Sequence, residues 1–144
     1  MERSSTAVWR GAGKEGSGVV STKSGAIKDH VYTASSRFVG EDGIPGTNPE
    51  ELIAAAHASC YAMALAFMLT GSGHAPEELR TTAHAKLEKL GELWTVTGIR
   101  LEVVGKVPGL APAAFVEAAN KAKTDCPISR LLASVPITLE AKLA

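Results

Sequence analysis

The sequence predicts an α+β fold in which strands and helices follow one another in the order βββ-α-ββ-α-β. Three observations support this prediction. The N-terminal third is rich in Gly, Ser, Thr and Val, the stretch 48–69 is dominated by alanine, and the second half contains segments of alternating apolar and polar residues. Because strands and helices are grouped, we expect two antiparallel sheets and a long, buried central helix.

Short strands are expected at the N-terminus. Three segments combine β-branched residues with flanking glycines, namely 6–10, 18–22 and 26–33. The connections between them, over 11–16 and 23–25, are short and glycine-containing, which predicts an antiparallel meander. A loop with several chain breakers follows over 39–46.

The long helix has clear start and stop signals. Asn48 suits the N-cap, Pro49 the first helical position and Glu51 the third, so that the capping-box pattern is complete. Gly71 is expected to end the helix. Residues 53–69 carry no formal charge, but they are rich in alanine and lack a basic flank. We therefore interpret the segment as a core helix buried on most sides and not as a membrane span.

A hairpin is predicted next. Apolar residues alternate over 79–90 and 93–104, which pair around a turn at 89–92. The segment 79–90 also tolerates a helix. The preceding residues, 76–78, suggest a short turn or half-helix.

Two further helices and one strand complete the chain. Residues 112–123 form an amphipathic pattern with three residues facing inward, Phe115, Val116 and Ala119. Residues 128–133 suggest one short helix more. The alternating segment 135–143 is expected to close the second sheet.

Composition narrows the function classes. The chain has 144 residues and a formal net charge of zero, as expected for one ordinary domain over residues 1–144. No basic surface for nucleic acid and no polybasic patch for a membrane is evident. The first residues lack the apolar core of a signal peptide, so we expect the cytoplasm, where thiols stay reduced. The two cysteines match no zinc spacing.

The two cysteines suggest thiol chemistry. Cys60 lies within the apolar helix, and Cys126 opens the distinctive motif Cys126-Pro127-Ile128-Ser129. A lone cysteine in a core helix is commonly just a small packed residue. It becomes a useful nucleophile only as a thiolate, and burial opposes that state. A cation must therefore be brought to Cys60 if Cys60 is to react.

Arg37 is the candidate cation, although an ordinary exposed arginine is the more usual interpretation from the sequence alone. Glu50 and Glu51 are both explained by helix capping and by the helix dipole. Glu51 takes the capping position, which leaves Glu50 as the freer carboxylate. Glu50 precedes Cys60 by ten residues, or roughly 15 Å of straight helix. A bridging arginine or an antiparallel partner chain is needed to connect them.

Local electrostatics alone favour Cys126 as the thiolate. It stands near the N-cap of a short helix, where the dipole lowers a thiol pKa, although Asp125 acts against this. A low pKa also makes Cys126 a good leaving group when an external thiol opens a disulfide. His57, three residues before Cys60, could form a Cys–His pair, but a packed polar side chain is the more ordinary interpretation.

The longest motif resembles a known family. Residues 47–60, followed by Met63-Ala64-Leu65, resemble the central helix of the OsmC/organic hydroperoxide resistance (OsmC/Ohr) family. Residues 126–129 resemble its second cysteine motif, and Arg37-Phe38 resembles its arginine element. The similarity covers nearly the whole chain. Glu51 and His57 point to the OsmC branch.

This resemblance implies an OsmC-like peroxidase domain that forms an intertwined homodimer with active sites at the subunit interface. The implied activity is the reduction of organic hydroperoxides, in defence against oxidative or osmotic stress. Cys60 is the implied peroxidatic thiolate and Cys126 the resolving thiol. Arg37 stabilises the thiolate and polarises the peroxide, and Glu50 orients Arg37. An external dithiol resets the disulfide, and no metal, haem or flavin cofactor is implied.

Two other functions fit the same residues. A thiol-based redox sensor or regulator uses both cysteines without turnover, but no DNA-binding motif supports a transcriptional version. A purely structural dimer is the other alternative, and the presence of both cysteines and Arg37 counts against it.

Overall fold

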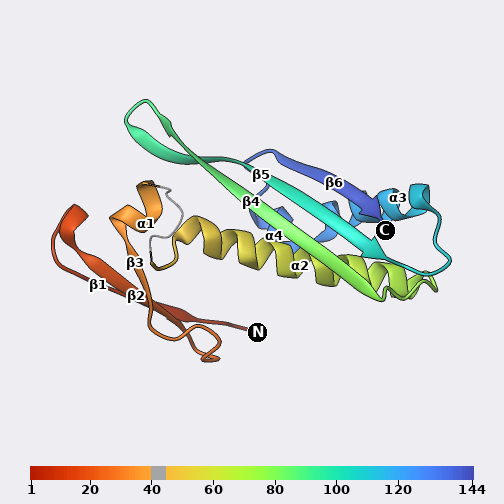
Figure 1. The fold of residues 1–144 in the computed structure, drawn as a ribbon, viewed down its shortest axis with the longest axis horizontal. Coiled ribbons are helices and arrows are strands. Elements are labelled where there is room, and N and C mark those ends of the chain that lie inside the picture. Colours follow the sequence, from red (N-terminus) through yellow and green to blue (C-terminus); the bar gives the residue numbers. More distant parts are fainter. Residues whose placement is uncertain (40–44) are drawn as a thin grey trace. The chain divides into compact units, whose positions relative to one another are not determined.

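The structure is a computed structural model that describes residues 1–39 and 45–144 (Figure 1). The chain divides into two compact units, Met1–Leu52 and Ile53–Ala144, each of which is described by itself. The chain contains two three-stranded sheets, and in each of them the strands lie in sequence order. The predicted α+β class with two sheets is confirmed, whereas the single domain over residues 1–144 stays a prediction.

The first unit contains the predicted antiparallel meander. Its strands are β1 (Ser5–Arg10), β2 (Ser17–Thr22) and β3 (His30–Thr33), with a 3-10 turn, η1 (Gly13–Glu15), in the first connection. The third strand is shorter than predicted. Its expected first residues fold back on β2 instead, where Thr22 N–H donates to Ile27 O at 2.9 Å and Asp29 N–H to Ser21 Oγ at 2.9 Å.

A short helix, α1 (Ala34–Phe38), follows β3 and was not predicted. Its five residues are too few for a recognisable period. Thr33 and Ser36 form a capping box, in which Ser36 N–H donates to Thr33 Oγ1 at 3.0 Å and Thr33 N–H to Ser36 Oγ at 2.9 Å. The predicted loop over 39–46 lies largely outside the described residues.

The long helix α2 (Pro49–Gly71) begins and ends where predicted. The expectation that it is buried on most sides is wrong for the single chain. Tyr61, Leu65 and Leu69 are buried, but Met63 is 57 % and Phe67 71 % exposed. The reason is that one face of the helix packs into the core, whereas Met63 and Phe67 lie on the other face and are left exposed by the residues that the structure describes. By length and composition α2 could also cross a membrane, with 22 % of its most apolar window buried.

The second unit contains the predicted hairpin. Strands β4 (Glu78–Leu90) and β5 (Leu93–Lys106) pair antiparallel, so the helical alternative for 79–90 is wrong. Gly91 supplies the positive φ, 62°, that the tight turn requires. The residues just before β4 contain a bend at Glu77 and no half-helix.

The last strand corrects the expectation of two antiparallel sheets. Strand β6 (Ile137–Leu143) pairs with β5 in parallel, so the second sheet is mixed. The physical reason is the long connection through α3 (Pro112–Asp125) and α4 (Pro127–Leu131), which carries the chain back to the middle of β5, where Ile137 pairs with Ile99. Parallel neighbours require such a crossover.

The helices of this unit cover one face of the sheet (Figure 1). Alternate residues of β5, including Leu101 and Val103, are buried with Phe115 and Ala119 of α3. Val116, predicted to face inward, is 40 % exposed. It follows Phe115 directly, and about 100° of rotation per residue turns it away from the core.

Candidate functional site

Cys60 and Cys126 meet in the second unit. Cys60 lies in the middle of α2, and Cys126 lies between α3 and α4, where it caps the end of one helix and the start of the other. Both are free thiols, and their Sγ atoms are 3.0 Å apart. Cys126 is fully buried and Cys60 partly buried. Two cysteines from separate motifs therefore form one pair.

The chain around Cys126 fixes its position. Cys126 N–H donates to Ala122 O at 2.9 Å, which closes the last turn of α3. Pro127 is the first residue of α4, a position at which its missing N–H costs no helical hydrogen bond. Cys126 is thereby both the C-cap of α3 and the N-cap of α4.

Burial raises the pKa of the Cys60 thiol, and the neighbouring Cys126 raises that pKa further. A hydrogen bond from the backbone N–H of Ile128 acts in the opposite direction and lowers the pKa. The sequence did suggest that burial opposes the thiolate, but the amide of Ile128 was missed. The sequence feature that indicates this amide is Pro127. Because proline has no N–H, the first N–H group of α4 belongs to Ile128.

A second buried contact joins the same two elements. His57 of α2 and Ser129 of α4 are 0 % and 5 % exposed, and His57 Nε2 lies 2.8 Å from Ser129 Oγ. Burial lowers the pKa of His57, because it disfavours the charged form of the ring. Among the described residues no hydrogen bond joins His57 to Cys60. The geometry fits a packed polar side chain and not a Cys–His pair.

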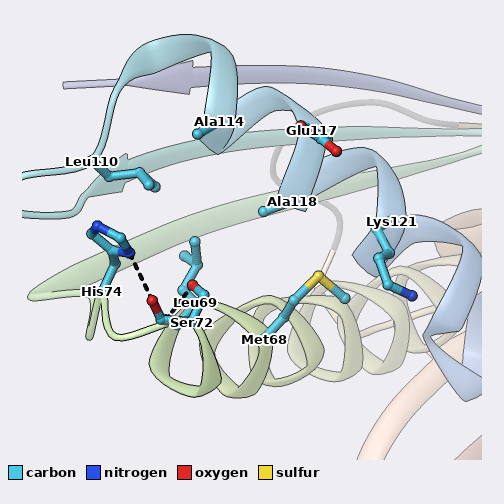
Figure 2. Close-up of a pocket in the computed structure, with 9 residues that line it drawn as sticks. All are labelled: Met68, Leu69, Ser72, His74, Leu110, Ala114, Glu117, Ala118 and Lys121. Carbon is cyan, nitrogen blue, oxygen red and sulfur yellow. Dashed lines mark hydrogen bonds between the residues drawn. The ribbon is translucent and has the colours of Figure 1, made fainter.

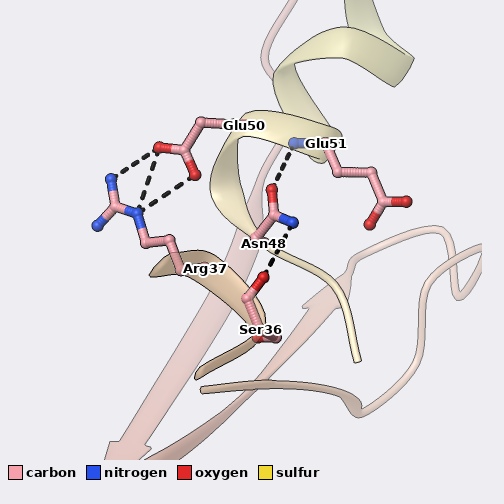
Figure 3. A network of polar contacts seen from close by, with 5 residues as sticks. All are labelled: Ser36, Arg37, Asn48, Glu50 and Glu51. Atoms are coloured by element: carbon pink, nitrogen blue, oxygen red, sulfur yellow. Dashed lines mark hydrogen bonds and ion pairs between the residues drawn. The ribbon is translucent and has the colours of Figure 1, made fainter. Parts of the chain in front are cut away.

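Arg37 and Glu50 form an ion pair in the first unit (Figure 3). Arg37 Nη2 donates to Glu50 Oε1 at 2.8 Å, and Arg37 Nε lies 3.3 and 3.2 Å from the two carboxylate oxygens. Glu50 is 8 % exposed, whereas the Arg37 side chain is 38 % exposed. A planar guanidinium held along one edge by a buried carboxylate has a defined orientation.

Polar contacts hold α1, which carries Arg37, against the start of α2, which carries Glu50. Ser36 Oγ donates to Thr47 O at 3.0 Å, and Asn48 Nδ2 donates to Ser36 O at 3.3 Å. Thr47 N–H in turn donates to Val31 O of β3 at 2.8 Å. These bonds place the two charged side chains opposite each other.

The predicted N-cap of α2 is confirmed, with one change in the capping box. Glu51 N–H donates to Asn48 Oδ1 at 2.8 Å. The Glu51 carboxylate, expected to return to the backbone of Asn48, accepts the Thr47 hydroxyl at 2.6 Å instead. Glu50 is left for Arg37, as the sequence suggested.

The predicted site residues thus form two pairs, Arg37–Glu50 in the first unit and Cys60–Cys126 in the second. The role predicted for Arg37 beside Cys60 joins the two units and stays a prediction. No group of three or more His, Cys, Asp or Glu side chains suited to a metal ion occurs within residues 1–39 and 45–144.

A separate hollow of about 310 Å³ lies between the end of α2 and α3 (Figure 2). Its lining is largely apolar and includes Met68, Leu69 and Leu110. His74 Nδ1 lies 3.1 Å from Ser72 O at its edge. None of the predicted site residues lines this hollow, so it is distinct from the cysteine pair.

The chain thus has an α+β fold in which a thiol of the long helix contacts a second thiol. These features are those of a protein with a pair of thiols in contact. Residues 40–140 match the model of a family described as OsmC-like protein. Peroxiredoxin OsmC of Escherichia coli (strain K12) is 41 % identical over 143 residues, which cover 99 % of this chain and 97 % of that protein. The chain therefore belongs to the OsmC-like family, which confirms the resemblance.

A further relative agrees with this assignment, and a solved structure agrees with the fold. The organic hydroperoxide resistance protein of Xanthomonas axonopodis pv. citri is 30 % identical over 120 residues, covering 81 % of this chain and 78 % of that protein. A solved OsmC-like protein of unknown function from Vibrio cholerae covers 98 % of this chain and 99 % of its own, with a TM-score of 0.76 at 16 % identity. That likeness shows the fold.

Replacing Asn48 tests how much the cap stabilises the start of α2, the helix that carries Glu50. We expect Asn48→Ala to lower the free energy of unfolding by about 1 kcal/mol, because the N–H of Glu51 loses its acceptor. Asn48→Asp keeps that acceptor but loses the amide donor to Ser36 O, so its loss should be smaller. Urea unfolding measures both. Equal losses for the two variants contradict the capping role.

Proposed function

We propose that this protein is a cysteine-based peroxidase that reduces organic hydroperoxides to alcohols. The observation that carries the proposal is the 3.0 Å contact between the two free thiols, Cys60 and Cys126. The names of two relatives support it, since one is a peroxiredoxin and the other an organic hydroperoxide resistance protein.

In the proposed reaction the Cys60 thiolate attacks one peroxide oxygen. The O–O bond breaks, an alcohol leaves after taking up a proton, and Cys60 becomes a sulfenic acid. The Cys126 sulfur then attacks the Cys60 sulfur and releases water, which gives the disulfide. An external dithiol supplies two electrons and two protons by thiol exchange and restores both thiols.

Arg37 is proposed to supply the charge that Cys60 lacks. Glu50 binds Arg37 through Nε and Nη2, and Nη1 takes no part in that contact. A guanidinium oriented in this way can direct an N–H toward a thiolate or a peroxide oxygen. The proposal holds whether Arg37 acts within one chain or across a dimer.

We also propose a homodimer in which a second copy covers the free face of α2. Met63 and Phe67 lie on this face and are 57 % and 71 % exposed. Helix α2 has no charged residue after Glu51, so a like surface can pack against it without burying a charge. The same apolar residues suit an alkyl hydroperoxide. The proposed compartment is the cytoplasm, where both thiols return to the reduced state.

Turnover tests the activity. Stopped-flow assays of cumene hydroperoxide with a dithiol reductant should show consumption by the wild type and none by Cys60→Ser, because the attacking sulfur is gone. Cys126→Ser should still react once per chain but turn over slowly. No consumption by the wild type, or an unchanged rate in Cys60→Ser, contradicts the peroxidase proposal. A wild type that closes its disulfide without turnover favours the redox-sensor alternative.

The charge supplied by Arg37 is tested by the pH profile of Cys60 alkylation. Burial raises the pKa of Cys60, so removing a nearby cation raises that pKa further. In a Cys126→Ala background, Arg37→Ala should therefore shift iodoacetamide reactivity to higher pH. Arg80→Ala is the matched control, since Arg80 is exposed and paired with Glu78 on β4. Superimposable profiles for the two variants refute the role of Arg37.

The dimer is tested by sedimentation. The wild type should have a mass near twice 14.9 kDa, and Phe67→Glu should shift it toward the monomer because a charge enters the apolar face. Leu131→Glu is a control, as Leu131 is 75 % exposed on α4. A wild-type mass near 14.9 kDa contradicts the dimer.

A further inference from the structure

The cysteine pair has a second contact beside it. His57 and Cys60 are three residues apart on α2, and Cys126 and Ser129 are three residues apart at the start of α4. Cys60 meets Cys126 and His57 meets Ser129, so the two segments run past each other in opposite directions. Each contact stands one helical turn from the other.

The His57–Ser129 contact is a side-chain hydrogen bond between α4 and α2, in addition to the contact between the two thiols. Ser129 is the buried residue of α4, and the helix is only five residues long. His57 Nε2 and Ser129 Oγ are 2.8 Å apart in a site that excludes solvent, and His57 Nδ1 has no partner among the described residues. The ring is therefore held through this one bond, and its loss leaves buried polar groups unpaired.

We propose that the His57–Ser129 hydrogen bond anchors Cys126 against Cys60 and so sets how readily the two thiols close into a disulfide. His57 and Ser129 are positioning residues, since neither takes part in the thiol chemistry. The inference rests on the proposed function in one respect, namely that Cys60 and Cys126 are a redox pair.

The His57–Ser129 hydrogen bond affects disulfide closure because it restricts the conformation of the reduced protein. With the bond in place, the first turn of α4 is already fixed and little conformational freedom is lost when the sulfurs join. Without it, the segment from Cys126 to Ser129 gains freedom while reduced. The effective concentration of one thiol at the other then falls, and closure becomes less favourable.

Glutathione redox buffers test this without any peroxide. One oxidised glutathione accepts two electrons from the thiols of Cys60 and Cys126, so that one protein disulfide and two reduced glutathiones form. Acid quenching, alkylation of free thiols and mass spectrometry give the closed fraction at each buffer ratio. The equilibrium constant is the effective concentration of the thiol pair.

We expect Ser129→Ala to lower this constant about tenfold, the size of one lost buried hydrogen bond. Ser59→Ala is the matched control, because the Ser59 hydroxyl is exposed and bonds only to Ala56 O of its own helix. Its constant should equal that of the wild type. Melting temperatures measured in parallel separate the anchor from a merely structural role, which lowers stability without changing the constant.

A pair of His57 variants provides a second test that does not depend on the folding of Ser129→Ala. Gln places its amide nitrogen near the position of His Nε2 and can still bond Ser129, whereas Asn is one methylene too short. His57→Gln should therefore keep most of the wild-type constant, and His57→Asn should lose about tenfold. Wild-type constants in Ser129→Ala and His57→Asn overturn the anchor alone. A wild type that forms no intramolecular disulfide overturns the redox pair as well.

Discussion

The close approach of the first turn of α4 to the middle of α2 is the contact on which the rest of the site depends. It places the sulfurs of Cys60 and Cys126 3.0 Å apart and brings the amide of Ile128 to Cys60. The end of α3, where Cys126 N–H donates to Ala122 O, and the buried His57–Ser129 bond both hold this approach in place. The crossover that returns the chain to β6 is therefore also the element that delivers the second thiol.

Burial has two opposite effects on this pair of thiols. The core that holds the thiols together raises the pKa of Cys60, so the same packing opposes the thiolate. The backbone N–H of Ile128 offsets part of this effect, because its hydrogen bond lowers the pKa of Cys60. The proposed role of Arg37 is to supply the rest as a guanidinium that Glu50 holds in one orientation, so that its charge and an N–H group act in a defined direction.

Sequence reasoning predicted the features that local signals specify. The caps of α2, the hairpin around Gly91 and the meander of the first unit all follow from short motifs. The direction of β6 was missed, because a strand's alternation is the same in a parallel or an antiparallel pair. The Ile128 amide and the His57–Ser129 bond were missed because they depend on how α4 meets α2. Pro127 was the visible sign of the first, and the spacing of three residues between each cysteine and its neighbour, His57 or Ser129, was the visible sign of the second.

The proposed function requires Cys60 and Cys126 to form one peroxide-responsive pair. The most direct test is to treat the reduced protein with one equivalent of an organic hydroperoxide and to map its thiols by mass spectrometry after proteolysis. We expect an intramolecular Cys60–Cys126 disulfide, with the loss of two hydrogen atoms per chain. A stable sulfenic acid on Cys60 with Cys126 still free, or two unmodified thiols, would contradict it.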